Sequence, residues 1–155
     1  MHKILFVCHG NICRSPMAEF VMKDLVKNAN LENDFLIDSK ATSTEELGNS
    51  VHPGTLKKLA QEGIKTFPHK ASQLNKEDYQ KYDFIIGMDS WNKRNILKIF
   101  GSDAEHKVYL LLDFTNQKRD IADPWYTHDF NSTFRDVKQG CTSLLNFILK
   151  KSTNA

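Results

Sequence analysis

The strongest constraint on the fold is an alternation of short apolar runs with longer amphipathic segments. The first run, Ile4 to Cys8, lies within residues 3–8, and others occupy 35–37, 83–86 and 108–112. Segments with apolar residues at steps of three and four follow, over 16–30, 53–63, 91–100 and 130–148. Buried strands separated by helices are typical of parallel sheets. The order predicts a single α/β domain of three layers, with a four-stranded parallel sheet and helices on both faces.

Length and charge narrow the function classes. The chain has 155 residues, and we expect one domain over 1–150 with a frayed tail over 151–155. The formal charge of +2, with dispersed basic residues, predicts no nucleic-acid or membrane partner. No N-terminal apolar run is long enough for a membrane span or signal peptide, so we expect a cytoplasmic protein. Three cysteines predict no disulfide framework.

The segment between the first strand and the first helix is the main candidate site. It reads Cys8-His-Gly-Asn-Ile-Cys-Arg14-Ser-Pro. Ligands of open parallel sheets bind beyond the carboxyl ends of the strands, and helix starts attract anions. We expect Ser15 to cap the helix, with Pro16 at its first position. Gly10 permits close approach and unusual φ, and Asn11 tolerates left-handed φ.

These residue types suit phosphoryl chemistry. Cys8 lies at the bottom of a predicted positive bowl, which favours its thiolate, the nucleophilic form. The planar guanidinium of Arg14 matches two phosphate oxygens, and the Ser15 hydroxyl can donate to the sulfur when it leaves. The predicted phosphate-binding loop after the first strand consists of His9, Gly10, Asn11, Ile12, Cys13, Arg14 and Ser15.

A second motif is Asp123-Pro124-Trp125-Tyr126. A phosphate ester needs an acid to protonate its leaving oxygen, and Asp123 has its backbone restricted by the following proline. Trp125 and Tyr126 are candidate apolar walls for an aromatic ring. On its own, Asp-Pro is a common turn signal, so this assignment depends on the rest of the chain.

The sequence resembles the low-molecular-weight protein tyrosine phosphatases from Lys3 to about Lys150. The resemblance rests on Val7 to Pro16 and Asp123 to Tyr126, with further matches at 38–43, His69, Gln73 and 88–89. It implies a reaction without metal or cofactor through a cysteinyl-phosphate intermediate. In it Cys8 is the nucleophile, Arg14 the phosphate clamp and Asp123 the general acid and then base. The loop would be held by hydrogen bonds of Asn11, Ser15, Ser39 and His69.

The resemblance also implies the partners: phosphotyrosine proteins or peptides and small aryl phosphates as substrates, and inorganic phosphate as product. We expect a monomer. Where the family commonly has an aromatic pocket wall, this chain has Glu45, which we expect at the rim as a wall that attracts basic residues flanking phosphotyrosine. Cys13 shares one tight loop with Cys8, so we expect it to be the redox partner of Cys8.

Four alternatives stay open at this point. An arsenate reductase of the same fold would need two further thiols, and beyond the loop the chain has only Cys141. Protein-arginine phosphatases carry, by resemblance, Thr at the position of Ile12. A silent phosphotyrosine-binding module would not need Cys8, Arg14 and Asp123 together. Zinc would need ligand spacings that the histidines do not supply. We expect Trp91 and the apolar stripe of the last helix to belong to the core.

Overall fold

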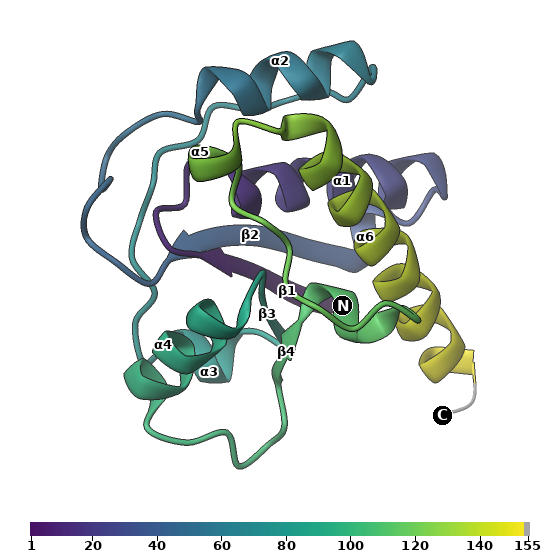
Figure 1. The fold of residues 1–155 in the computed structure, drawn as a ribbon. Helices are drawn as coiled ribbons and strands as arrows, with labels where there is room; N and C mark the ends of the chain where they lie inside the picture. The colour runs from purple at the N-terminus through teal and green to yellow at the C-terminus, as the bar shows by residue number, and fades with distance from the viewer. Residues whose placement is uncertain (154–155) are drawn as a thin grey trace.

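The computed structural model describes residues 1–153 and shows an α/β domain of three layers (Figure 1). The strands are β1 (His2–Cys8), β2 (Phe35–Ala41), β3 (Phe84–Gly87) and β4 (Val108–Leu110). The α-helices are α1 (Arg14–Asn28), α2 (Pro53–Gln61), α3 (Asp78–Lys81), α4 (Ser90–Phe100), α5 (Pro124–Thr127) and α6 (Phe130–Thr153). Two short 3-10 helices, Glu32–Asp34 and Leu111–Phe114, complete the regular structure of these residues.

The four strands form one parallel sheet in the order β2-β1-β3-β4, as predicted. Cys8 pairs with Ala41 of β2, and Val7 pairs with Gly87 of β3. The carboxyl ends of the three strands therefore lie together at one edge of the sheet. In Figure 1 this edge is on the left, beside α4 and α5.

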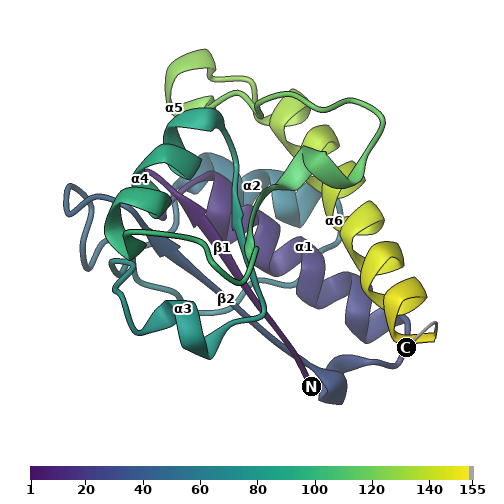
Figure 2. The same cartoon turned by 90° about the horizontal axis from the view of Figure 1, so that it is seen from below.

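The alternation of β1 residues divides the core between the two faces of the sheet. Ile4, Phe6 and Cys8 belong to the larger cluster, to which α1 and α6 contribute. Leu5 and Val7 belong to the smaller cluster, to which α4 contributes. Figure 2 shows α1, α2 and α6 on one side of the sheet and α3 and α4 on the other. The predicted coverage of both faces is confirmed.

Three local predictions were wrong. Helix α1 begins at Arg14 and not after Ser15, because the Ser15 hydroxyl bonds within the loop and does not cap the helix. Trp91 is 64% exposed and does not join the core, because the buried side of α4 is carried by Asn92 and Ile96. Strand β2 continues to Ala41 through alternating buried and half-buried residues.

Helix α6 carries the predicted apolar stripe, in which Val137, Cys141, Leu144 and Ile148 are buried. It extends through Thr153, whereas residues 154 and 155 of the expected tail lie outside the described residues. Among residues 1–153, no helix combines the length and the apolar character needed to cross a bilayer.

Candidate active site

The phosphate-binding loop predicted from the sequence connects the end of β1 to the start of α1. Asn11 adopts the left-handed conformation expected of it, with φ of 60°. Gly10 does not have the unusual φ that we expected, since the positive-φ glycines of the described chain are elsewhere. Its small size still matters, because a Cβ there would lie 3.2 Å from Cγ of Glu46. The loop thus obtains its tight turn from Asn11 and its close packing from Gly10.

The Cys8 thiol lies at the base of this loop and is almost fully buried. The backbone N–H of Asn11 donates to Cys8 Sγ over 3.3 Å, and Ser15 Oγ lies 3.0 Å from the same sulfur. Because Ser15 Oγ already accepts a hydrogen bond from Asn11 Nδ2 at 2.8 Å, its own proton is available to the sulfur. The sulfur therefore has two donors that stabilise negative charge on it.

Asn11 is the centre of the hydrogen-bond network that supports the loop. Its side chain is fully buried. Nδ2 donates to Ser15 Oγ and, over 3.0 Å, to Ser39 Oγ. Oδ1 lies 3.0 Å from His69 Nε2 and accepts from the Ser72 backbone N–H over 3.2 Å. The structure thus brings together all four predicted support residues, Asn11, Ser15, Ser39 and His69, and adds the backbone of Ser72.

The network ends on a buried carboxylate that the sequence reasoning missed. Ser39 Oγ donates to Glu19 Oε1 over 2.6 Å, and His69 Nδ1 lies 3.7 Å from the same oxygen. Burial lowers the pKa of His69, although Glu19 opposes the shift. Glu19 lies on the inner face of α1, where its helical spacing from Ser15 was the available sequence signal.

The Arg14 guanidinium is held from three directions. Nη1 donates to Asp89 Oδ2 over 2.7 Å and to the carbonyl of Ile121 over 2.8 Å. Nη2 lies 3.4 Å from Asp123 Oδ2, whereas Nε is buried without a hydrogen-bond partner. Burial acts to lower the pKa of Arg14, but the combined electrostatic effects of Cys8, Asp123 and Asp89 outweigh it and raise the pKa. A fixed cation with an unused N–H is suited to binding an anion.

Asp89 is among the residues that match the family in the sequence, but no role was predicted for it. It follows β3 and caps α4: its Oδ1 accepts from the Asn92 N–H over 2.7 Å, and the Asn92 side chain accepts from the Asp89 N–H. Its other oxygen holds Arg14. The capping pattern Asp-x-x-Asn was visible in the sequence, but the contact with Arg14 spans 75 positions.

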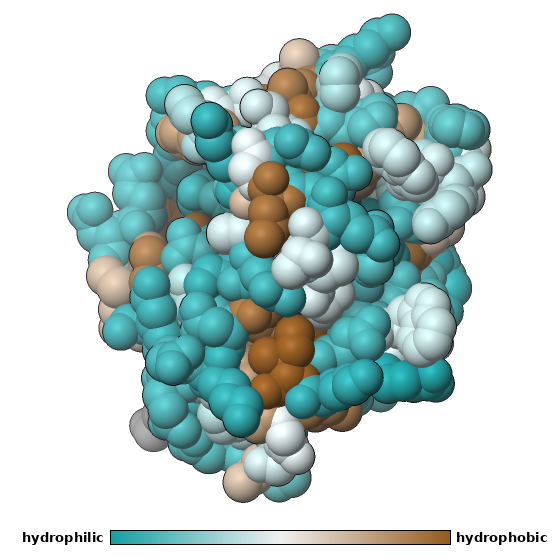
Figure 3. Space-filling model, turned by 90° about the vertical axis from the view of Figure 1, so that its left-hand side faces the viewer, coloured by the Kyte–Doolittle hydropathy of each residue, from teal (hydrophilic) through white to brown (hydrophobic). Residues whose placement is uncertain are grey.

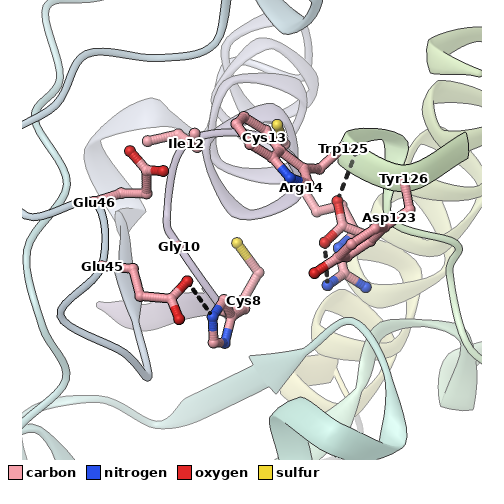
Figure 4. A pocket seen from close by; sticks show the side chains of 11 residues that line it. Cys8, Gly10, Ile12, Cys13, Arg14, Glu45, Glu46, Asp123, Trp125 and Tyr126 are labelled. Atoms are coloured by element: carbon pink, nitrogen blue, oxygen red, sulfur yellow. Dashed lines mark hydrogen bonds and ion pairs between the residues drawn. The ribbon is translucent and has the colours of Figure 1, made fainter. Parts of the chain in front are cut away.

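Asp123 faces Cys8 across a pocket (Figure 4). It caps α5, since Oδ1 accepts from the Trp125 N–H over 3.0 Å. The pocket is lined by Cys8, His9, Gly10, Ile12, Cys13, Arg14, Glu45, Glu46, Asp123, Trp125 and Tyr126. The three predicted catalytic residues and the three predicted wall residues therefore line one cavity, at the sheet edge whose mostly hydrophilic surface is shown in Figure 3.

The rim of the pocket has a polar side, at Glu45, and an aromatic side, at Trp125. Glu45 Oε2 lies 2.9 Å from Nε2 of His9, so its carboxylate is tied to the phosphate loop. On the opposite side, the ring of Trp125 meets the edge of His52, which in turn stacks on Phe130. His52 was not a predicted site residue. Its backbone N–H donates to the Ile12 carbonyl over 2.8 Å, which joins this wall to the loop.

The other two cysteines are buried free thiols. Burial, with smaller contributions from Cys8 and Asp123, raises the pKa of Cys13 to about 12. Burial also raises the pKa of Cys141. This residue lies on the inner side of α6, and its Sγ is 3.7 Å from the carbonyl of Ala18 in α1. Within residues 1–153, no group of three His, Cys, Asp or Glu side chains is arranged to hold a metal ion.

Comparisons with known proteins agree with this geometry. Residues 3–154 match the family described as low molecular weight phosphotyrosine protein phosphatase. The chain is 40% identical over 152 residues to the low molecular weight phosphotyrosine protein phosphatase of Sus scrofa, covering 96% of this chain and 94% of that protein. It is 37% identical over 153 residues to the low molecular weight protein-tyrosine-phosphatase YfkJ of Bacillus subtilis, covering 97% of this chain and 98% of YfkJ.

Solved structures give the same result. The crystal structure of YfkJ superimposes with a TM-score of 0.94, over 97% of this chain and 96% of that one. The crystal structure of a drosophila arginine phosphatase superimposes with a TM-score of 0.86 at 30% identity, over 94% and 97% of the two chains.

Proposed function

The chain belongs to the low molecular weight phosphotyrosine protein phosphatase family and is a protein tyrosine phosphatase, and we propose that Cys8, Arg14 and Asp123 carry its reaction. The observation that supports this most directly is that all three line one pocket, in which the buried Nε of Arg14 has no partner. The proposed substrates are phosphotyrosine proteins and peptides and small aryl phosphates, whose rings would lie between Ile12 and Trp125.

The first half of the reaction transfers the phosphoryl group to sulfur. The Cys8 thiolate attacks phosphorus, the bond from phosphorus to the phenolic oxygen breaks, and Asp123 gives its proton to that oxygen. Arg14 and the loop N–H groups of residues 9–15 stabilise the charge on the phosphate oxygens. Asp89 fixes Arg14, so the clamp is in place before substrate arrives.

The second half releases inorganic phosphate. Asp123, now a carboxylate, takes a proton from a water molecule, which attacks phosphorus while the bond to Cys8 Sγ breaks. The Ser15 hydroxyl, 3.0 Å from the sulfur, donates to the departing thiolate. All the side chains that take part in this cycle belong to one protein chain, which supports our proposal that a monomer is active. Because Cys8 must stay reduced, we also propose a reducing, cytoplasmic setting.

The deciding experiment compares the parent enzyme with Cys8→Ser. We expect the variant to retain phosphate binding, because the loop and Arg14 remain, and to lose turnover of phenyl phosphate by several orders of magnitude, because a serine hydroxyl without an adjacent base is a poor nucleophile. Acid-quenched parent enzyme should carry phosphate bound to Cys8 in a peptide map. Substantial turnover by Cys8→Ser would contradict the assignment.

Substrate choice is tested with matched peptides of phosphotyrosine, phosphoserine and phosphoarginine. We expect phosphotyrosine to be preferred. The likeness to an arginine phosphatase makes phosphoarginine the necessary comparison, and a preference for it would replace our proposed substrate. The arsenate reductase alternative is disfavoured by Cys141, because this thiol is fully buried on the inner side of α6, within the core, and does not line the pocket.

A further inference from the structure

Trp91 is an exposed tryptophan beside the catalytic pocket with no role in the proposed reaction. It is 64% exposed, which is unusual for so large an apolar side chain. The guanidinium of Arg94 lies 4.8 Å from its ring centroid, so the ring is held in place from within α4. Helix α4 follows β3 at the sheet edge that carries the phosphate loop (Figure 1). Trp91 lies beside the site, because it lines a hollow together with Arg14 and Asp123.

Trp91 lines a hollow of about 450 Å³ that continues from the catalytic pocket. The hollow shares His9, Arg14, Asp123 and Tyr126 with that pocket. Tyr126 is 77% exposed, so its ring is accessible from both cavities. The two cavities are therefore neighbouring parts of one surface, with shared lining residues.

Trp91 and Tyr126 supply the two large rings of the hollow, and its other lining side chains are polar or charged. Its two carboxylates, Asp89 and Asp123, lie against the single cation Arg14, which compensates one of the two negative charges. Arg94 lines a different hollow, with Ser90 and Asp120, on the other side of Trp91. The face of Trp91 toward the catalytic side is thus left uncovered by Arg94. Among the described residues, the side-chain amide of Asn95, which also lines the hollow, has no hydrogen-bond partner.

From these observations we propose that the hollow between Trp91, Tyr126 and His9 binds the side chain of a residue adjacent to phosphotyrosine, and that it favours an aromatic or large aliphatic side chain. The inference rests on the proposed function. A phosphotyrosine ring in the pocket leaves its backbone at the rim, and the next Cα lies about 3.8 Å further along the peptide. The adjacent side chain then reaches the hollow, and the Asn95 amide is available to the peptide backbone.

The test uses peptides with Gly on both sides of phosphotyrosine and matched peptides with Phe or Leu on one side. Each kcat/KM is divided by the value of the same enzyme for phenyl phosphate, which has no adjacent residue. We expect the parent to prefer the Phe or Leu peptide by about 2- to 10-fold, the value of one aromatic contact. Trp91→Ala should reduce the preference to about one, and Trp91→Phe should retain most of it. The matched control is Phe147→Ala, which removes an exposed ring near the end of α6.

A binding measurement checks the same contact independently of turnover. In a Cys8→Ser, Trp125→Phe protein, Trp91 is the only tryptophan, because the chain has two. Its fluorescence should change with the Phe-flanked peptide and not with phenyl phosphate. A parent that hydrolyses all phosphotyrosine peptides without preference, or a preference that persists in Trp91→Ala, would overturn the subsite alone. Failure of the parent to hydrolyse any phosphotyrosine substrate would instead overturn the proposed function.

Discussion

Replacing Asn11 separates two contributions to the stability of the phosphate loop. Asn11→Ala removes four hydrogen bonds and keeps a Cβ at φ of 60°. Asn11→Gly removes the same bonds but relieves the left-handed strain. Three of the four partners keep another contact: Ser15 with Cys8, and Ser39 and His69 with Glu19. The Ser72 N–H is left with no other partner among the described residues.

The expected loss of unfolding free energy depends on the hydrogen bonds removed and on the backbone strain at position 11. Each of the four lost hydrogen bonds contributes about 0.5–1.5 kcal/mol net, part of which the remaining contacts and water at the exposed residue Ser72 recover, and a left-handed residue with a Cβ costs about 1–2 kcal/mol relative to glycine. We therefore expect Asn11→Gly to lower the free energy of unfolding by about 2 kcal/mol and Asn11→Ala by about 3 kcal/mol. Both losses are smaller than the usual total of about 5–15 kcal/mol, so both variants should fold.

Urea unfolding and kcat/KM for phenyl phosphate are the measurements. A displaced loop should lower kcat/KM by about 100-fold in both variants. Asn30 supplies the matched control, since it has φ of 59°, is exposed, and has no side-chain hydrogen bond among the described residues. Asn30→Ala and Asn30→Gly should differ by the strain alone and leave kcat/KM unchanged. If the two Asn11 variants unfold at the same urea concentration as the parent, the hydrogen bonds of Asn11 do not stabilise the loop, which would contradict this prediction.

Four further predictions concern protons, thiols and charge. Asp123→Asn should slow phosphate esters in proportion to the basicity of the leaving group, and equal slowing of all esters would assign Asp123 a structural role. Because the pKa of His69 is lowered on folding, the unfolded state binds more protons below about pH 6.5, so stability should fall as the pH drops below that value. Urea midpoints at pH 5.5 and 7.5 should therefore differ less in His69→Gln. After treatment with peroxide and then a thiol reductant, the parent should recover more activity than Cys13→Ala, because a disulfide with Cys13 protects Cys8 from irreversible oxidation. The pKa of Cys13 is about 12, so its thiol is protonated and we expect the disulfide to form slowly. Equal recovery of activity in both proteins would contradict this redox role of Cys13. Glu45→Gln should reduce any preference for basic over acidic residues beside phosphotyrosine by a small, salt-sensitive factor, since Glu45 is exposed and already paired with His9. If the ratio of kcat/KM for basic and acidic peptides changes neither with this substitution nor with salt, Glu45 has no role in specificity.

The sheet and the phosphate loop could be predicted because their signals are local. Ile4 to Cys8 is a continuous apolar run, which a buried central strand requires. Strand β2 was predicted too short for the opposite reason: it is an edge strand, and its later residues include polar side chains with tertiary partners. Ser39 is buried against Glu19, and the Asp38 carboxylate accepts from the Tyr82 hydroxyl over 2.6 Å.

The contacts that complete the site were not visible in the sequence because they join distant segments. Asp89 holds Arg14 from the end of β3, and Glu19 closes the network from inside α1. Trp91 was misplaced because the buried side of α4 is carried by Asn92 and Ile96, one turn apart, and Trp91 is not on it. The inward position of the first turn is occupied by a polar residue, Asn92, which the apolar pattern could not indicate.

The proposed nucleophile, Cys8, and the proposed general acid, Asp123, belong to parts of the molecule that we expect to differ in their resistance to local opening. Cys8 is the last residue of a strand with neighbours on both sides, and its side chain belongs to the core beneath α1 and α6. Asp123 precedes a helix of four residues with largely exposed side chains. We therefore expect thermal fluctuations that fall short of global unfolding to displace the Asp123 carboxylate before the Cys8 sulfur. With the proposed roles, protonation of a poor leaving group is then lost before the capacity to form a phosphoenzyme.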